Sequence, residues 1–266
     1  SYEGKKTSTV ICNGHRISAI LYISHLKPNI TRIEFINPAK LSGTIILSNK
    51  DGLWRYIPSK QVWLEISNKP VKLRDVDDSV MGNYKVKLLG ESSVAKRKTL
   101  VLEVKPKSKG DLVKKVWVDK QHFVIVGIEV YAPNGQILHS SYFTSINFQP
   151  KFNSESFRIK GRIIRKNHTQ IAFKVLAPKY IPKGYLLVEK GSVVTGGHPS
   201  FHLFYSNGVG GFSIFQWPLS KGEKLPKPPP ITGANMIVWT MQGRGFVAFG
   251  DISLSELRKI SKSIKP

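Results

Sequence analysis

Few residues in this chain have the types and spacing that catalysis or metal binding requires. Asp77 and Asp78 form the only adjacent acidic pair, but successive side chains of a strand point to opposite faces, so a loop or helix-capping role is favoured over a catalytic dyad. His198 and His202 lie four residues apart, a spacing that could hold a metal ion on a helix. Pro199 and the strand-like residues after it oppose a helix, and no third ligand is evident, so we expect no metal site.

The sequence also lacks the common catalytic motifs. It contains no HExxH, no G-x-S-x-G and no GxxxxGK[ST] pattern. The glycine-rich stretch "NGVGGF" joins two strand-like segments instead of opening a helix, so turn geometry explains its glycines. Cys12 is the only cysteine, which excludes an internal disulfide and a thiolate metal site and indicates a buried or idle thiol. We therefore expect no enzyme, no catalytic residues and no cofactor.

The chain of 266 residues is strongly basic, with 41 Lys and Arg against 17 Asp and Glu and a formal net charge of +24. Such an excess attracts nucleic acid, anionic lipid and acidic protein through the same field. The basic residues are scattered along the whole chain, with short clusters at 96–98, 105–109 and 158–166. A scattered charge favours a generally solvated surface over a nucleic-acid stripe, and it leaves an anionic membrane surface as a partner.

One hairpin, "DGLWRYIPSKQVWLEIS" at 51–67, is unusually aromatic. Alternation along a strand places Trp54 and Tyr56 on one face, and we expect Val62, Leu64 and Ile66 of the partner strand to share it, with Trp63 on the opposite face. One interpretation is a bulky core with one exposed ring. The other is a trough in a curved sheet that binds acyl chains, at roughly 0.8 kcal/mol for each buried CH₂. We name these five residues (Trp54, Tyr56, Val62, Leu64 and Ile66) as candidate lipid-binding residues.

The elements that position these residues are mostly strands. Residues 7–148 contain about a dozen short β-branched or aromatic segments separated by turn dipeptides, which predicts one large, curved antiparallel sheet. A helical turn is expected near 75–81. The basic stretch "IKGRIIRKN" (159–167) reads as a linker between a first domain, 1–158, and a second, 168–266. Two hairpins and the amphipathic "SLSELRKISKSI" predict a smaller α+β domain with an antiparallel sheet and a C-terminal helix.

The order of these segments resembles the MucB/RseB family of sigma-E regulatory proteins. The resemblance is carried by "GNYKVKLLGESSVAKRKTLVLEVKPK" and "VWVDKQHFVIVGIEVYAPNGQILHSSYFTSINF" in the first domain. In the second domain it is carried by "YIPKGYLL", "FHLFYSNGVGGFSIFQ" and "GRGFVAFGDISLSELRKISKSI". The first domain alone is similar to lipoprotein carriers of the LolA type. The resemblance implies an unclosed LolA-like β-barrel with a hydrophobic cavity, followed by the smaller α+β domain.

The resemblance also implies a function in envelope stress. Members are periplasmic, bind the extracytoplasmic region of a membrane-bound anti-sigma factor, and are released by lipid, so we expect an exported protein from which a leader has been removed. We expect partner contacts on the second domain, with Tyr205, Phe212, Phe215 and Trp217 as candidates, although the same aromatics could be core. Two departures, Lys96 in place of an expected Gly and the proline-rich "KLPKPPP", leave room for a different partner. A LolA-like carrier of lipoproteins or lipids is the alternative function, and a homo-oligomer is left open.

Overall fold

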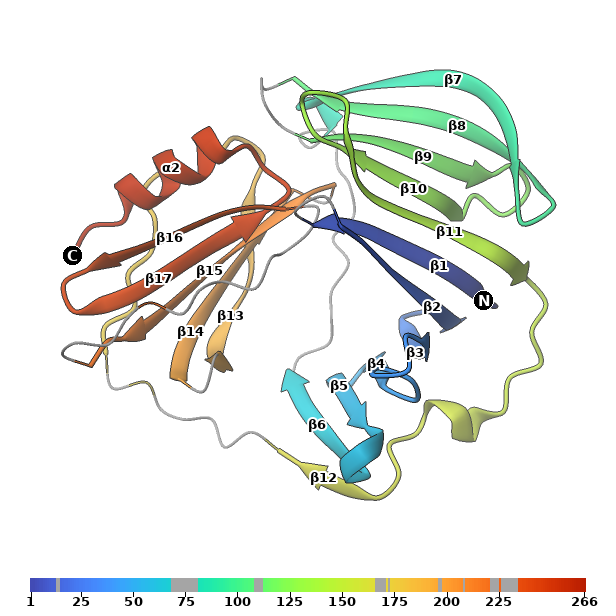
Figure 1. Cartoon of the computed structure of the whole chain (residues 1–266), viewed down its shortest axis with the longest axis horizontal. Coiled ribbons are helices and arrows are strands. Elements are labelled where there is room, and N and C mark those ends of the chain that lie inside the picture. Colours follow the sequence, from blue (N-terminus) through green and yellow to red (C-terminus); the bar gives the residue numbers. More distant parts are fainter. Residues whose placement is uncertain are drawn as a thin grey trace.

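Two β-sheets build the fold of this protein, and Figure 1 shows them side by side. The computed structural model describes residues 1–12, 15–67, 81–107, 112–165, 171, 173–195, 198–207, 209–220, 225 and 234–266. The first sheet has twelve strands and the second has five. The expected fold class, a large curved sheet followed by a smaller α+β unit, is confirmed.

The large sheet is a meander in which most strands pair with their neighbours in sequence. Its order is β12-β6-β5-β4-β3-β2-β1-β11-β10-β9-β8-β7. The pairs are antiparallel except for β12 and β6, which are parallel. The strands are β1 (Tyr2–Cys12), β2 (His15–Leu26), β3 (Ile30–Asn37), β4 (Ile45–Asn49), β5 (Gly52–Ile57), β6 (Val62–Ser67), β7 (Tyr84–Val94), β8 (Arg97–Pro106), β9 (Val113–Asp119), β10 (Ile125–Tyr131), β11 (Ile137–Asn147) and β12 (Arg162–Ile164).

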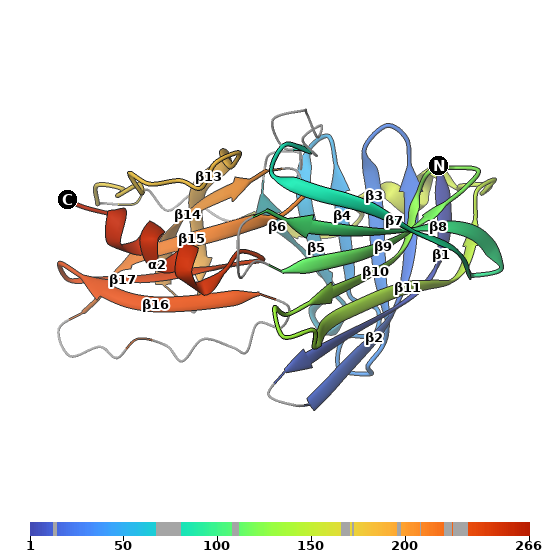
Figure 2. The same cartoon turned by 90° about the horizontal axis from the view of Figure 1, so that it is seen from above.

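The sheet twists and bends strongly without closing. In Figure 2 its strands fan out from β7 to β2, and β7 contacts β11 although three strands separate them in the sheet. Short turns make this meander possible, as between β10 and β11, where Gly135 adopts a φ of 82° that glycine tolerates without a steric penalty. The connection from β11 to β12 carries only a short 3₁₀ turn, η2 (Ser154–Phe157).

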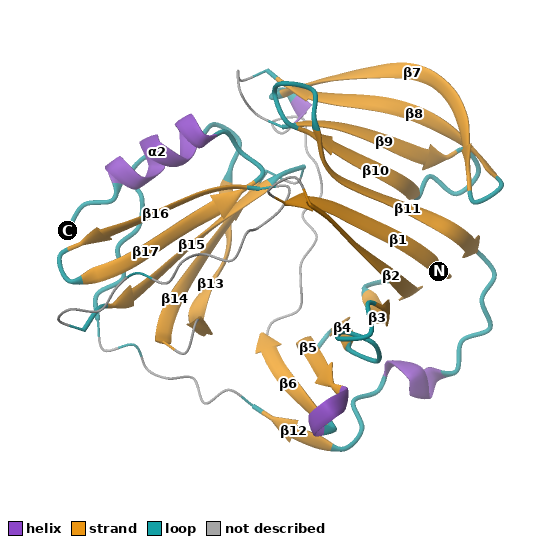
Figure 3. Cartoon of the chain, in the orientation of Figure 1, coloured by secondary structure: helices purple, strands orange, loops and turns teal. Residues whose placement is uncertain are grey.

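The second sheet packs one face against the helix that ends the chain, as Figure 3 shows. Its order is β13-β14-β15-β17-β16. Helix α2 (Leu254–Ser263) begins at Ser253, whose hydroxyl accepts a hydrogen bond from the Glu256 amide at 3.2 Å, as the capping spacing predicts. Its apolar stripe is fully buried at Leu257 and Ile260. The strands are β13 (Leu186–Thr195), β14 (His198–Ser206), β15 (Gly211–Pro218), β16 (Asn235–Met241) and β17 (Arg244–Gly250).

Polar bonds join the two sheet units at one end of the large sheet. The Lys114 ammonium group of β9 donates to the Asp251 carboxylate and to the Val209 carbonyl, both at 2.5 Å. Asn207 donates to the Tyr84 hydroxyl at 2.6 Å. The charged bond is partly shielded from solvent, which strengthens it relative to an exposed ion pair. These contacts place the start of β15 directly beside β7 and β9.

The predicted linker contributes to the large sheet. Residues 162–164 form β12 and extend the edge at β6, while residues 166 and 167 lie outside the described residues. The domain limits at 158 and 168 stay a prediction. The expected helical turn near 75–81 also falls almost wholly outside the described ranges. Within those ranges, no helix has the length and apolarity needed to cross a membrane.

Candidate functional site

One face of the large sheet carries a continuous apolar surface from β7 to β10. Directly opposed residues of neighbouring strands share a face, and the register opposes Leu88 to Leu102, and Leu102 to Val116. Val116 in turn opposes Ile128. We call this face the inner face. Its apolar members on these strands include Val86, Leu88, Leu100, Leu102, Val104, Val116, Val118, Ile128 and Val130.

The inner face is enclosed at the middle of the sheet and open at the β7 edge. Lys6 of β1 lies on this face opposite Phe143, with its ammonium nitrogen 5.3 Å from the ring centroid, and burial lowers the pKa of Lys6. At the β7 edge, by contrast, Leu88 is 57% exposed and Val86 is 44% exposed. An apolar surface that begins in solvent and continues into a desolvated region has the shape that an acyl chain requires.

The aromatic hairpin is arranged differently from the prediction. The register opposes Tyr56 to Trp63, with their ring centroids 5.3 Å apart, and Trp54 shares this face because it lies two residues from Tyr56. The prediction that Trp63 lies on the opposite face is therefore wrong. Val62 and Leu64 lie on the other face of the hairpin, which the pairing across β5, β4 and β3 connects to the inner face.

Loop length and a bulge explain the error. Ile57 pairs with Val62 across a four-residue turn that contains η1 (Pro58–Lys60). A loop one residue longer would have exchanged the two faces of the second strand, because side chains alternate with a period of two. A register shift between Leu53 and Trp54 then leaves Ile66 as an extra residue in β6. The five candidate lipid-binding residues are thus divided between two faces.

The face that carries Trp54 is covered by the chain itself. Trp54 and Trp63 are 5% and 6% exposed and pack in one cluster with Leu47 and Phe157, the last of which belongs to the connection between β11 and β12. The Trp63 indole N–H donates to the Lys160 carbonyl at 3.1 Å. An acyl chain at Trp54 would have to displace this connection. Lipid binding by the five residues stays a prediction, and the inner face is the more accessible apolar surface.

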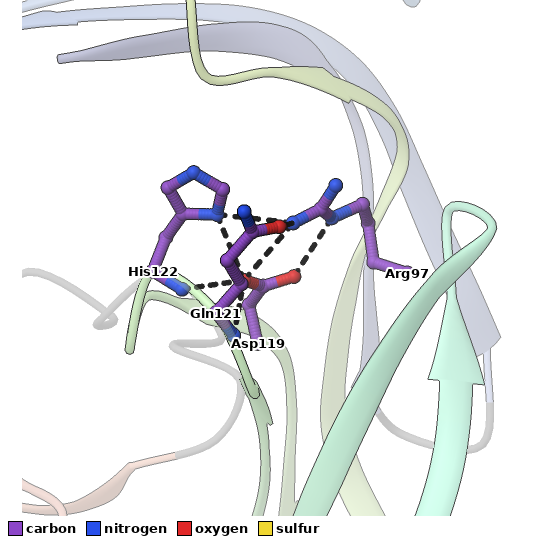
Figure 4. A network of polar contacts seen from close by, with 4 residues as sticks. All are labelled: Arg97, Asp119, Gln121 and His122. Carbon is purple, nitrogen blue, oxygen red and sulfur yellow. Dashed lines mark hydrogen bonds and ion pairs between the residues drawn. The ribbon is translucent and has the colours of Figure 1, made fainter.

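A polar network braces the turn between β9 and β10 (Figure 4). The buried Asp119 carboxylate accepts hydrogen bonds from the Arg97 guanidinium at 2.8 Å and from the backbone amides of His122 and Gln121 at 2.7 and 3.1 Å. Burial alone would raise the pKa of Asp119, but these hydrogen bonds more than offset it and hold the pKa well below its usual range. The His122 ring stacks on Phe148 with centroids 3.8 Å apart. The turn is thereby fixed to the ends of β8 and β11.

Most of the candidate partner-binding aromatics belong to the core of the second unit. Tyr205, Phe212 and Trp217 are 5%, 1% and 3% exposed, so a partner could not reach them without unfolding. Phe215 lies on the sheet face opposite the helix and stacks on His202, with centroids 4.3 Å apart. Burial lowers the pKa of His202 to about 4, so this ring is neutral at physiological pH. Partner binding by the four aromatics stays a prediction, and Phe215 is the accessible member.

A small cavity lies where the two units meet. Its volume is about 170 Å³, and it is bordered by Tyr84 and Lys107 from the large sheet and by Tyr180, Tyr185 and Glu256 from the second unit. The Tyr180 hydroxyl donates to the Glu256 carboxylate at 2.7 Å. This volume is too small for an acyl chain of ordinary length, which sets the cavity apart from the inner face.

The structure brings together no metal-binding set among its described residues. Within those ranges, no group of three or more His, Cys, Asp or Glu side chains could hold a metal ion. His198 and His202 lie on strand β14, not on a helix, as expected. Asp77 and Asp78 lie outside the described residues, as do Gly208 of the glycine-rich turn and the side chain of Cys12.

Comparisons with known proteins agree with this architecture. A family model described as "-like: Uncharacterized protein" matches residues 29–182, and no curated protein matches the sequence significantly. The structure of MucB in complex with MucA(peri) has a TM-score of 0.71 at 17% identity and covers 100% of this chain and 93% of that chain. The Pseudomonas aeruginosa MucA/MucB complex has a TM-score of 0.71 at 18% identity, with the same coverage. At these identities the likeness shows a shared fold across both units.

The LolA resemblance is much weaker in three dimensions. The LolA superfamily protein NE2245 from Nitrosomonas europaea has a TM-score of 0.29 at 15% identity and covers 60% of this chain and 90% of that chain. A score at this level carries no argument about the fold of the first unit. The similarity that extends through both units is the one to MucB.

Proposed function

The chain belongs to the family described as "-like: Uncharacterized protein", and we propose that it is a non-enzymatic, extracytoplasmic regulator. In this proposal it binds the extracytoplasmic region of a membrane-bound anti-sigma factor and accommodates acyl chains of lipid or lipoprotein on the inner face of its large sheet. The observation that carries the proposal is the apolar inner face, open at β7, within a fold that matches MucB along the whole chain.

The lipid part of the proposal depends on Leu88 and its neighbours. Leu88 and Val86 are exposed on one side of the sheet and continue into the partly buried Leu102 and Val104. Each methylene that moves from water onto such a surface gains roughly 0.8 kcal/mol. The apolar members of the inner face therefore favour an acyl chain, and Lys6 deeper along the same face would favour an anionic head group.

The proposed partner and the proposed location rest on the similarity of this chain to MucB. Structures of MucB with MucA share the arrangement of both units with this chain, and the MucB/RseB resemblance implies an anti-sigma factor as partner and the periplasm as location. Phe215, beside His202 on the helix-free face of the second sheet, is a candidate contact. A binding assay between the chain and the extracytoplasmic region of a membrane-bound anti-sigma factor from the same organism tests this part.

A fluorescent fatty acid tests the lipid part. We expect saturable binding to the intact chain, and we expect Leu88→Asp to weaken it at least ten-fold because an ionised carboxylate would lie on the acyl path. Leu186→Asp is the matched control, because Leu186 is 53% exposed on β13 of the other unit. If the fatty acid does not bind, or if both variants bind it equally, acyl binding on the inner face is refuted.

A lipid or lipoprotein carrier is the second candidate. The open β7 edge favours it, because an acyl chain could leave the inner face sideways without unfolding the sheet. Transfer of a labelled lipid between donor and acceptor vesicles, in proportion to the amount of protein, would support the carrier. Binding without transfer, combined with binding to the anti-sigma factor, would support the regulator.

A further inference from the structure

The most exposed large apolar side chain of the described residues sits at the tip of a braced turn. Phe123, between β9 and β10, is 76% exposed, and Ile125 two residues later is 50% exposed. A ring as exposed as Phe123 contributes little to a core, and half of the Ile125 side chain also lies in water. Both side chains therefore lie on the surface where β9 turns into β10.

The backbone of the turn holds Phe123 in an unusual conformation. Its φ is 55°, in the left-handed region that a bulky residue rarely adopts. The Phe123 amide donates to the Asp119 carbonyl at 3.0 Å, and the Asp119 amide donates to the Val124 carbonyl at 2.9 Å. Together with the Arg97 ion pair (Figure 4), these bonds fix the backbone from which the exposed ring projects. An exposed aromatic ring held in a strained, braced turn is typical of a binding element.

The surroundings of this tip are basic. The Lys120 amide donates to the Lys98 carbonyl at 3.0 Å, so the hairpin tip between β7 and β8 lies directly beside the turn. Lys120 is paired with Glu91. Lys96 and Lys98 are exposed and form no ion pair with the described residues. The tip is thus an apolar point beside a local excess of positive charge, because four basic residues (Lys96, Arg97, Lys98 and Lys120) lie there with two carboxylates (Glu91 and Asp119), on a chain with a net charge of +24.

We propose that this tip, formed by Phe123, Ile125, Lys96 and Lys98, is a membrane-contact site that inserts its apolar side chains at the surface of an anionic bilayer. An apolar point with a basic border fits the interface between acyl chains and anionic head groups, because the Phe123 ring and the Ile125 side chain enter the boundary while the ammonium groups remain at the phosphates. This inference goes beyond the proposed function, since the inner face could accept acyl chains from a partner without any contact between the turn and a bilayer.

The test is co-sedimentation of the whole chain with vesicles. Vesicles of phosphatidylethanolamine and phosphatidylglycerol are compared with vesicles of phosphatidylcholine, and we expect binding to the anionic vesicles that weakens with salt. Phe123→Ala should lower the partition coefficient roughly ten-fold. Lys96→Gln combined with Lys98→Gln should lower it by roughly ten-fold or more.

Matched controls separate this site from general attraction. Leu186→Ala removes an exposed apolar side chain from the second unit, and Lys85→Gln combined with Lys87→Gln removes two exposed charges from β7. We expect both controls to bind vesicles within two-fold of the wild type. If the controls lose as much binding as the tip variants, or if Phe123→Ala binds normally, the site is overturned. Normal vesicle binding by Phe123→Ala with weakened binding to the anti-sigma region would assign the tip to a protein partner instead.

Discussion

Asp119→Asn tests whether the braced turn stabilises the large sheet. The Asp119 side chain is 1% exposed and its Arg97 partner is 29% exposed. The substitution preserves shape, and the remaining amide oxygen can still accept the two backbone hydrogen bonds, but the charge-assisted bond to Arg97 is lost. Such bonds contribute about 1.5–3 kcal/mol, and partial exposure of Arg97 lowers the expected loss to about 2 kcal/mol in the free energy of unfolding.

The pH dependence makes this prediction specific. The folded-state pKa of Asp119 lies below the ordinary value of 3.8, so its stabilisation is fully present above that value and is lost as the pH falls through the folded-state pKa. Urea unfolding followed by circular dichroism should therefore show a smaller difference between wild type and variant at pH 3 than at pH 7. Glu91→Gln, which breaks a solvent-exposed ion pair with Lys120, should leave stability unchanged. An equal difference at both pH values, or a loss below about 0.5 kcal/mol, would refute the reasoning.

Three further substitutions test the second unit and its contact with the first. Gly250→Ala places a Cβ atom 2.3 Å from the Gly211 carbonyl oxygen, and we expect about 2 kcal/mol of destabilisation, visible as a lower Tm. Ile260→Ala removes a side chain of 0% exposure from α2 and should cost roughly 2–5 kcal/mol in urea unfolding; a loss under 1 kcal/mol would contradict the packing. Lys114→Met removes the ammonium partner of Asp251, and amide hydrogen exchange at the start of β15 should become faster, with no change expected in α2.

The sequence predicts the architecture because its local signals agree with one another. Strand-like segments separated by turn dipeptides produced the twelve-stranded meander, and the Ser253 cap with its apolar stripe produced α2 where expected. Each of these signals depends on residues close together in the sequence, so it can be read without knowing which distant segments are in contact. Agreement between propensity, pattern and capping is what makes a fold readable from sequence.

The candidate site was harder to predict because it depends on register. The faces of Trp54 and Val62 are set by one residue of loop length, which composition does not reveal. Trp54 is covered by Phe157, which lies about a hundred positions later in the chain. No local sequence pattern predicts this contact. By contrast, the alternation of Lys85, Val86, Lys87 and Leu88 could have pointed to an apolar face on β7.

Because β7 is an edge strand of the large sheet, its lysines can oppose pairing with another strand. The outer side of an edge strand offers backbone donors and acceptors to any other extended chain, and this strand is eleven residues long. Lys85 and Lys87 alternate with the apolar Val86 and Leu88. A second copy that approached edge to edge would therefore bring four ammonium groups together. Repulsion between these lysines would oppose edge-to-edge pairing of two copies. The same charges would let Val86 and Leu88 stay exposed to water at this edge.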